Sequence, residues 1–292
     1  MYELHSASKG LVSHGVTTCA GCALELIFRN VLDVLGEDTI IVIPPGCSAI
    51  FSGYGKETAI KIPGIQGTLE STAAAISGIK RGLLAQGNTH TTVLGFAGDG
   101  ATLDIGLQSL SGMVERNENV VYVCYDNEAY MNTGIQGCSS TPLWASTTTT
   151  PSGKPTPSKE LVRILAAHNI PYAATASVAY LTDLRRKVKK AKETEGAAVL
   201  HVQTPCPTGW RFDPAKTIEL ARAAVETGFW ILYEFENGKF IINKKLKSFK
   251  PIEAYIKGQG RFKHLTAEEI EKLQAAVQQS YERFVNSCNA GQ

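Results

Sequence analysis

Short apolar runs recur along the chain, and glycine, proline or asparagine stands near the end of each run. The runs are rich in β-branched residues and short for helices, so they predict strands that are buried on both faces of a sheet. Each strand would open into a loop at its last residues. The runs lie at residues 38–46, 91–100, 119–127 and 197–206.

Patterns with helical spacing separate these runs. Gly87 stands where a helix would end, and Ser158 and Thr182 stand where N-caps of two further helices are expected. One pattern carries four apolar residues on a single face: Leu103, Leu107, Leu110 and Val114. The predicted helices cover residues 70–87, 101–117, 158–168 and 182–196.

Strands that alternate with helices are typical of a doubly wound α/β fold with a mostly parallel sheet, in which ligands bind beyond the carboxyl ends of the strands. We expect this fold over residues 1–212. Residues 139–159, rich in threonine, proline and serine, predict a long loop. Residues 213–292 contain a helix, a hairpin-like pattern and an amphipathic helix after Thr266. We expect them to form a C-terminal extension that packs on partner subunits, although a small appended subdomain would have the same pattern.

Composition and charge exclude several classes of function. The chain has 292 residues, and its formal net charge of +2 argues neither for nor against nucleic acid. Because it has no zinc-finger, RNP-like or long basic segment, no binding to nucleic acid is expected. No apolar stretch approaches the ~18 residues of a membrane span, and the first ten residues lack the apolar run of a signal peptide. We therefore expect a soluble, cytoplasmic protein without membrane contact. Two further polar features are expected to be structural: the basic run 185–192, as a solvated helix face, and His201.

The segment around Gly98, Asp99 and Gly100 ends one predicted strand and begins a helix, and Asn127 ends the next strand along the chain. Loops at the ends of neighbouring parallel strands lie side by side, so Asp99 and Asn127 can bind one ion. Carboxylate and amide oxygens are ligands that Mg²⁺ takes together with substrate phosphates. The two glycines let the backbone approach a ligand closely, and the start of the next helix favours an anion.

Seven cysteines, an odd number, do not indicate a disulfide framework in a chain without a secretory signal. Cys19 and Cys22 form a C-x-x-C pair, while Cys47 and Cys206 each follow a predicted strand, so four thiolates can gather at one edge of the sheet. Four sulfur ligands suit either Zn²⁺ or a [4Fe–4S] cluster. Cys138 is the rival for the fourth position. Two cysteines are expected to be inert: Cys124 and Cys288.

The spacing of the G-D-G segment and Asn127 resembles the thiamine diphosphate motif. Further segments extend the resemblance over roughly residues 10–235: "GVTTCAGC", "GDGATLDIGLQSLSG", "YDNEAYMNTGIQ", "SSTP", "VRILAAHNIPYAATAS", "DLRRKVKKAKETEG" and "PCPTGWRF". In them the chain is similar to the β subunits of 2-oxoacid:ferredoxin oxidoreductases, close to the pyruvate synthase branch.

The resemblance implies a fold of the thiamine diphosphate-binding type and three cofactors: thiamine diphosphate, Mg²⁺ and a [4Fe–4S] cluster. It implies that the side chains of Asp99 and Asn127 and the main-chain carbonyl of Ala129 bind the metal, with Gly98 and Gly100 beside the diphosphate. Asn132 is expected to face the substrate end of the cofactor. The cluster ligands would be Cys19, Cys22, Cys47 and Cys206, with Cys47 also next to thiamine diphosphate. Iron–sulfur is favoured over zinc because a redox cluster can accept electrons from the reaction.

The resemblance also implies the oxidative decarboxylation of a small 2-oxoacid with electron transfer to ferredoxin. The glutamate that contacts the aminopyrimidine ring and the outer iron–sulfur clusters are expected on partner subunits, since neither Glu70 nor Glu128 is an evident candidate and no ferredoxin-like cysteine run occurs. Coenzyme A would be a second substrate in a pyruvate-type enzyme.

One segment departs from the pyruvate-type pattern. Residues 64–67, with the sequence Gly-Ile-Gln-Gly, lie where aromatic residues are usual near the third cysteine ligand. The substrate is therefore either pyruvate or a smaller, more polar acid such as oxalate, which would need no coenzyme A. Two other classes are weighed against this function: an iron-free thiamine diphosphate carboligase or dehydrogenase component, and a zinc-stabilised module without catalysis.

Overall fold

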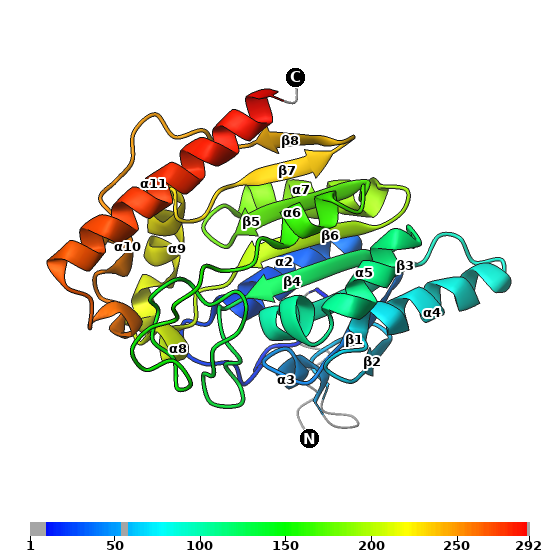
Figure 1. The fold of residues 1–292 in the computed structure, drawn as a ribbon. Coiled ribbons are helices and arrows are strands. Elements are labelled where there is room, and N and C mark those ends of the chain that lie inside the picture. The colour runs from blue at the N-terminus through cyan, green and yellow to red at the C-terminus, as the bar shows by residue number, and fades with distance from the viewer. Residues whose placement is uncertain (1–9, 54–57, 291–292) are drawn as a thin grey trace.

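A computed structural model of the protein describes residues 10–53 and 58–290. Residues 1–9, in which the sequence shows no signal-peptide pattern, therefore lie outside the described part. One eight-stranded sheet runs through the molecule in the order β2-β1-β3-β4-β6-β5-β7-β8 (Figure 1). Strands β1 to β6 are parallel, and the last two are antiparallel. The strands are β1 (Thr39–Ile43), β2 (Gly64–Gln66), β3 (Thr92–Gly98), β4 (Val121–Asp126), β5 (Tyr172–Ser177), β6 (Ala198–Gln203), β7 (Tyr233–Glu236) and β8 (Lys239–Ile242).

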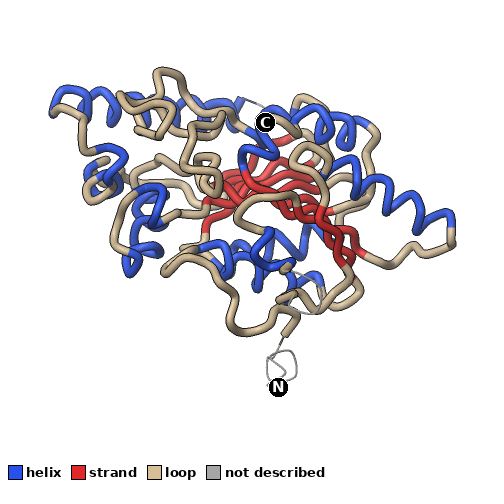
Figure 2. The backbone as a smooth tube through the Cα atoms, turned by 90° about the horizontal axis from the view of Figure 1, so that it is seen from below, coloured by secondary structure: helices blue, strands red, loops and turns tan. Residues whose placement is uncertain are grey.

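The doubly wound α/β architecture expected from the sequence is confirmed. Figure 2 shows the twisted sheet as a layer between helices on both sides. Helices α2 (Ala23–Leu35) and α7 (Leu181–Glu193) pack against each other on one face. The other face is covered by α4 (Thr72–Ala85), α5 (Leu107–Glu115) and α6 (Leu161–Ala166). Because both faces are covered, every residue of β4, β5 and β6 is buried.

The four apolar runs correspond to β1, β3, β4 and β6, and two parallel strands were not predicted. Strand β5 has the sequence YAATAS, whose alanines carry little strand preference, and its pairing with β6 and β7 determines its conformation. Strand β2 has only three residues, all exposed, and lies at the edge of the sheet.

Two predicted helix starts are wrong. Helix α6 begins after Glu160 rather than at Ser158, and Thr182 lies inside α7, which begins after Tyr180. The helix expected over 101–117 is divided into a π-helical turn, η2 (Gly100–Asp104), and α5. The predicted end at Gly87 agrees with the structure, where this glycine has a φ of +79° just after α4.

Residues 213–292 add the β7–β8 hairpin to the same sheet, through β5. Helix α11 (Ala267–Ala290) begins after Thr266, whose hydroxyl accepts a hydrogen bond from Glu269 N while its own N–H donates to the Glu269 carboxylate. The remaining short elements are α3 (Ala49–Ser52), α8 (Pro207–Trp210), η3 (Pro214–Lys216), α9 (Thr217–Glu226), α10 (Glu253–Ile256) and η4 (Gly260–Phe262). Whether this extension also packs on partner subunits stays a prediction.

The basic run in α7 is only partly a solvated face. Lys187 is fully buried, where its ammonium group donates to Asp183 and to the carbonyl of Thr175. Arg186 and Lys190 both contact Glu234 on β7. These ion pairs attach α7 to the hairpin of the C-terminal extension. In the described part of the chain, no helix combines the length and the apolar character that a membrane span requires.

Candidate functional site

The order in which the chain adds strands to the sheet reverses between β1 and β3. The chain passes from β1 to β2 on one side and from β3 to β4 on the other, so the loops after β1 and β3 diverge and leave a crevice at their carboxyl ends. A cavity of about 360 Å³ occupies this position, and its walls include the loops after β1, β3 and β4. Every residue expected to contact thiamine diphosphate or its substrate end lines this cavity: Cys47, Gly98, Asp99, Gly100, Asn127, Ala129 and Asn132.

Asp99 is a buried carboxyl group at the end of β3, with 2% of its surface exposed. Its Oδ2 accepts hydrogen bonds from the hydroxyl of Ser140 at 2.7 Å and from the thiol of Cys138 at 3.2 Å. Burial raises the pKa of Asp99 well above its usual range, and the neighbouring carboxyl of Asp126 raises it further. Two buried carboxyl groups without a cation destabilise each other's charge, so the arrangement favours the binding of a cation.

Asn127 presents an unpaired acceptor to the same region. Its Oδ1 is buried and has no hydrogen-bond partner in the protein, which leaves this acceptor available to a ligand. Its main-chain carbonyl, in contrast, accepts a hydrogen bond from Trp210 Nε1 at 2.8 Å. With the Asp99 carboxylate and the backbone of Ala129 on the same cavity wall, the residues present fit a Mg²⁺ ion that bridges to a diphosphate.

The glycine at the start of η2 is required by a close contact. A Cβ atom on Gly100 would lie 2.3 Å from the ring of Tyr130, which forms part of the cavity wall. Asn132 lies on the same wall and is exposed. Its expected place at the substrate end of the cofactor therefore stays a prediction, supported by its position at the accessible part of the cavity.

The four predicted cluster ligands are neighbours in space. Cys22, Cys47 and Cys206 are partly buried and Cys19 is exposed. Burial raises the pKa of Cys22 to about 11, with smaller contributions from the thiols of Cys206 and Cys19. Burial also raises the pKa of Cys47 to about 12, and the same neighbouring thiols add to that shift. These electrostatic contributions indicate that the four thiols lie in the same region, and Cys47 also lines the cofactor cavity.

Cys138, the rival fourth ligand, lies beside Asp99 and is not among the residues that line the cofactor cavity. Its thiol contacts Asp99, as described above, and also the hydroxyls of Ser140 and Thr141. Among the residues that the structure describes, no three or more His, Cys, Asp or Glu side chains enclose a position for a metal ion. Both the magnesium site and the iron–sulfur site therefore stay predictions, supported by the residues gathered at each place.

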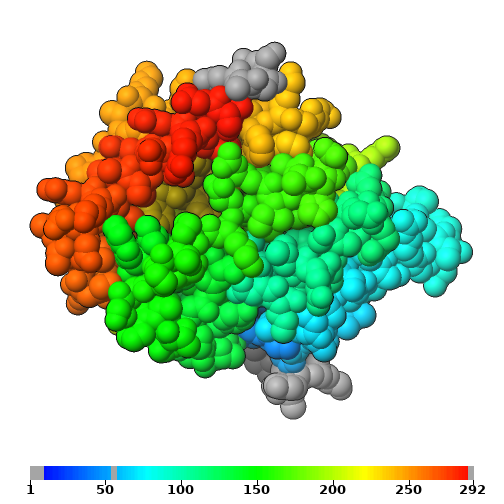
Figure 3. All heavy atoms as spheres, viewed as in Figure 1, coloured from blue at the N-terminus to red at the C-terminus, as the bar shows by residue number. Residues whose placement is uncertain are grey.

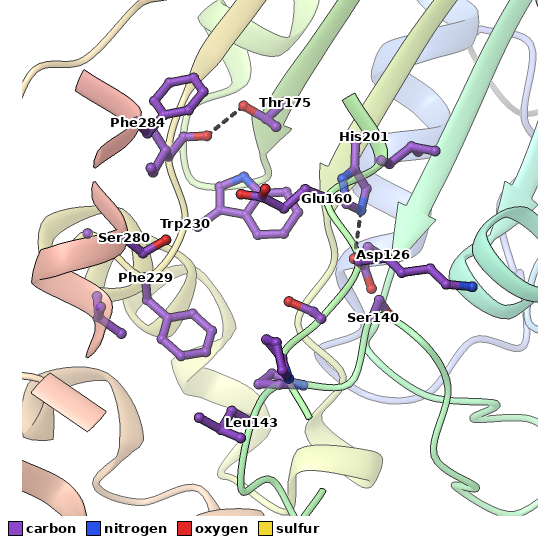
Figure 4. A pocket seen from close by; sticks show the side chains of 18 of the residues that line it. Asp126, Ser140, Leu143, Glu160, Thr175, His201, Phe229, Trp230, Ser280 and Phe284 are labelled. Carbon is purple, nitrogen blue, oxygen red and sulfur yellow. Dashed lines mark hydrogen bonds and ion pairs between the residues drawn. The ribbon is translucent and has the colours of Figure 1, made fainter. Parts of the chain in front are cut away.

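A second cavity, of about 300 Å³, lies on the other side of the loop that follows β4. Figure 3 shows a hollow between helix α11, in orange and red, and the green segment of the long loop. In Figure 4 the imidazole of His201 points toward Asp126, and the ring of Trp230 lies beside it. The Nε2 atom of His201 is 2.6 Å from Asp126 Oδ2, so His201 has a structural partner.

Residues 126–129 form the wall between the two cavities. Asn127 and Ala129 line the cofactor cavity, whereas Asp126 and Glu128 line the second one. The Glu128 carboxylate forms a buried ion pair with Arg261. Burial raises the pKa of Glu128 to about 7, and the Arg261 guanidinium opposes this shift.

The sequence analysis did not identify Arg261 or the contact of Trp210 with the loop. Arg261 lies in η4, far along the chain from the motif that it contacts. Its local sequence, "GQGRFKHL", has no pattern that indicates a contact with the motif. Trp210 belongs to the "PCPTGWRF" segment, so its proximity to the cofactor site had a signal, although its hydrogen bond to Asn127 did not.

Comparisons with known proteins agree with this geometry. Residues 45–202 match the family model of the thiamine pyrophosphate enzyme, C-terminal TPP binding domain. The chain is 51% identical over 264 residues to pyruvate synthase subunit PorB of Methanothermobacter thermautotrophicus, covering 89% of this chain and 92% of that one. It is 48% identical over 282 residues to ketoisovalerate oxidoreductase subunit VorB of Pyrococcus horikoshii, covering 92% and 91% of the two chains.

A solved structure shows the same fold. The chain superimposes on a 2-oxoglutarate:ferredoxin oxidoreductase from Magnetococcus marinus with a TM-score of 0.60 and 19% identity, over 90% of this chain and 94% of that one. At this identity the likeness concerns the fold, and the family assignment depends on the matched domain and the relatives with about half of their residues in common. The chain therefore belongs to the β subunits of the thiamine pyrophosphate-dependent 2-oxoacid:ferredoxin oxidoreductases.

Proposed function

We propose that this β subunit binds the diphosphate of its cofactor through Mg²⁺ and holds the [4Fe–4S] cluster nearest to it. With partner subunits it would oxidatively decarboxylate a small 2-oxoacid and pass the electrons to ferredoxin. The observation that carries the proposal is that Asn127, with its unpaired Oδ1, and Asp99, with its buried carboxyl group, line one cavity between β1 and β3. The relatives named above are oxidoreductase subunits.

In this proposal each residue has a distinct role. Asp99, Asn127 and the carbonyl of Ala129 bind Mg²⁺, and Gly98 and Gly100 let the backbone approach the diphosphate. Asn132 contacts the substrate end. Bound thiamine diphosphate supplies the nucleophilic carbon and the electron sink for decarboxylation. The buried surroundings of Asp99 strengthen its attraction for the metal, because fewer water molecules screen its charge.

The cluster is proposed at Cys19, Cys22, Cys47 and Cys206. Since Cys47 also lines the cofactor cavity, a cluster bound there would lie directly beside the electron donor. The main-chain N–H of Gly209 already donates to the sulfur of Cys206 at 3.3 Å, and such bonds stabilise the negative charge of cluster sulfurs. Zinc at the same thiols would leave the electrons without an acceptor.

Pyruvate is the first substrate candidate, because pyruvate synthase subunits are among the relatives, and 3-methyl-2-oxobutanoate is the second. Oxalate is the third candidate. Gln66 of β2 lines the cavity and supplies a polar group where aromatic residues are usual, which would suit a smaller, more polar acid. Dependence on coenzyme A distinguishes them, since oxidation of oxalate yields only carbon dioxide. The cytoplasm is the proposed compartment.

The composition of the cavity wall supports a role for partner subunits in completing the cofactor site. Among the described residues that line the cavity there is no glutamate. Glu128 lines the second cavity, where its carboxylate is neutralised by Arg261. A partner chain with a pyrimidine-binding domain would supply the glutamate, and further clusters on partner chains would carry electrons to ferredoxin.

The test is anaerobic co-purification with the partner subunits, followed by metal analysis and assays of viologen reduction. Pyruvate, 3-methyl-2-oxobutanoate and oxalate are compared with and without coenzyme A. Asp99→Ala should abolish turnover, whereas Asp33→Ala, which removes an exposed carboxylate, should not. Turnover that survives Asp99→Ala would show that the diphosphate site is misplaced. A colourless protein with full cofactor would favour the iron-free class, and zinc without visible absorption would favour the non-catalytic module.

A paired substitution tests the fourth cluster ligand. Cys206→Ala should remove most of the iron and the visible absorption of the assembled enzyme, because the cluster loses one of its four thiolates. Cys138→Ala should retain the iron, because its thiol lies beside Asp99. Iron analysis and absorption spectra of both variants show whether Cys206 or Cys138 is the fourth ligand. Loss of iron from Cys138→Ala alone would reverse the assignment.

A further inference from the structure

We propose that Arg261 is a positioning residue for the metal-binding loop 126–129 and that it acts through Glu128. This inference rests on the proposed function, in which Asn127 and Ala129 bind the Mg²⁺ of thiamine diphosphate. It gives the C-terminal extension a part in building the cofactor site, in addition to any contact with partner subunits.

The loop has a conformation that needs support. Glu128 has a φ of +67°, in the left-handed region that residues other than glycine rarely adopt. This turn at Glu128 places Asn127 and Ala129 on the wall of the cofactor cavity and directs Glu128 to the opposite side. The left-handed residue is therefore the reason that both proposed ligands face the same cavity.

Glu128 is held at three points. Its N–H donates to Asp126 Oδ1 at 2.9 Å, and its carbonyl accepts from the hydroxyl of Thr141 at 2.7 Å. Its carboxylate forms the ion pair with Arg261, and both side chains are only 3% exposed. The first two contacts come from the same loop region, so Arg261 is the connection to a separate part of the fold.

Arg261 is itself held in place by neighbours on the C-terminal extension and on α8. Its Nε donates to Gln259 Oε1 at 2.8 Å, and its Nη2 donates to the hydroxyl of Tyr255 at 3.1 Å. The guanidinium lies over the ring of Trp210, 3.8 Å from its centre. Trp210 in turn donates to the carbonyl of Asn127, so one guanidinium supports the loop by two routes.

Removal of the guanidinium would leave the Glu128 carboxylate buried without a positive partner. Glu128 would then turn toward solvent, and the left-handed conformation would lose its anchor. Asn127 Oδ1 and the carbonyl of Ala129 would no longer converge on one ion. Groups that orient metal ligands typically contribute about tenfold to hundredfold to metal affinity, so a loss of this size is expected.

The experiment is a Mg²⁺ titration of the assembled enzyme, stripped of metal and supplied with saturating thiamine diphosphate, with intrinsic tryptophan fluorescence as the signal. Arg261→Met and Glu128→Gln should each raise the Kd for Mg²⁺ by about tenfold or more. The double variant should be no weaker than the weaker single variant, because both changes break the same contact. In assays, KM for Mg²⁺ should rise while kcat at saturating Mg²⁺ largely recovers.

Arg186→Met and Asp99→Ala are the reference variants: the first tests for a general loss of stability, and the second tests the proposed metal site itself. Arg186→Met removes a guanidinium from Glu234, a carboxylate that is also 3% exposed but lines neither cavity, so it should leave the Kd for Mg²⁺ unchanged. Equal weakening by Arg186→Met would show a general loss of stability and overturn the positioning role. Normal affinity in Arg261→Met and Glu128→Gln, with affinity lost in Asp99→Ala, would also overturn it. Normal affinity in Asp99→Ala would instead refute the proposed function.

Discussion

Because Gly100 has no side chain, the wall of the cofactor cavity can keep its shape at this position. Gly100→Ala would bring a Cβ atom to 2.3 Å from the Tyr130 ring, which must then move into or away from the cavity. We expect a loss of about 1–3 kcal/mol in the free energy of unfolding and weaker binding of thiamine diphosphate. Denaturant unfolding and cofactor titration measure the two effects.

The matched control is Gly82→Ala in α4. This glycine is exposed and has open space where a Cβ atom would lie. Alanine there should stabilise the protein by about 0.5–1 kcal/mol, because it restricts the unfolded chain and favours the helix. An equal effect of both substitutions on cofactor binding would contradict the role of the close contact at Gly100.

The residues of the candidate site differ in how far the sequence could predict them. Asp99 and Asn127 follow buried strands, so the parallel-sheet pattern alone was enough to predict that both line one crevice. Arg261 is different, because a single arginine in an irregular segment has no periodicity, and its partner is known only once the chain has folded. The left-handed conformation of Glu128 was also beyond prediction, since a glutamate gives no sign of it.

At the scale of elements, α7 and β7 are joined by charges that the hydrophobic pattern does not include. Glu234 is 3% exposed, and burial alone would raise its pKa. Hydrogen bonds from Arg186, Tyr172, Lys190 and Asn243 outweigh burial and lower the pKa of Glu234 to about 2. The ionised carboxylate is therefore part of what holds the C-terminal hairpin on the sheet.

This network predicts a dependence of stability on pH. The pKa of Glu234 is lower in the folded chain than in the unfolded chain, so its contribution is complete above about pH 4.5 and is lost as the pH falls toward about 2. Glu234→Gln should remove roughly 2 kcal/mol at pH 7, allowing for the solvent that reaches its partners, and should flatten the change in stability between pH 5 and about 3. Urea unfolding at several pH values measures both.

Glu236→Gln is the control for the acid titration. Glu236 contacts Lys190 from the same hairpin but is 31% exposed, so its removal should cost little at any pH. If the wild type and Glu234→Gln lose the same stability between pH 5 and about 3, the carboxylate is not the group responsible.

Element boundaries were less predictable than the elements themselves. The apolar runs gave four strands because burial on both faces demands continuous apolar sequence. Strand β5 follows from tertiary contacts, because it pairs with strands on both sides. The helix is divided at Gly106, where a Cβ atom would lie 2.1 Å from the carbonyl oxygen of Ala101. Local propensity does not contain this information.

At the scale of the whole molecule, one edge of the sheet borders the cofactor cavity and the other edge does not. Strand β2 forms one edge, all three of its residues are exposed, and its Gln66 lines the cofactor cavity. Strand β8 forms the other edge, remote in strand order from the cavity. Each carries an exposed isoleucine, Ile65 at 55% and Ile241 at 45%.

An exposed apolar side chain on an open edge favours association with another chain. The partner that completes the cofactor site must lie next to the cavity, so we expect it to cover β2. Ile65→Lys should therefore weaken assembly with the partner subunits and lower viologen reduction, while Ile241→Lys on β8 should leave both near the wild type. Co-purification yield and sedimentation measure assembly, and circular dichroism checks that each variant folds. Full assembly of Ile65→Lys, or loss of assembly in Ile241→Lys alone, would place the partner on another face and leave the missing glutamate to reach the cavity from there.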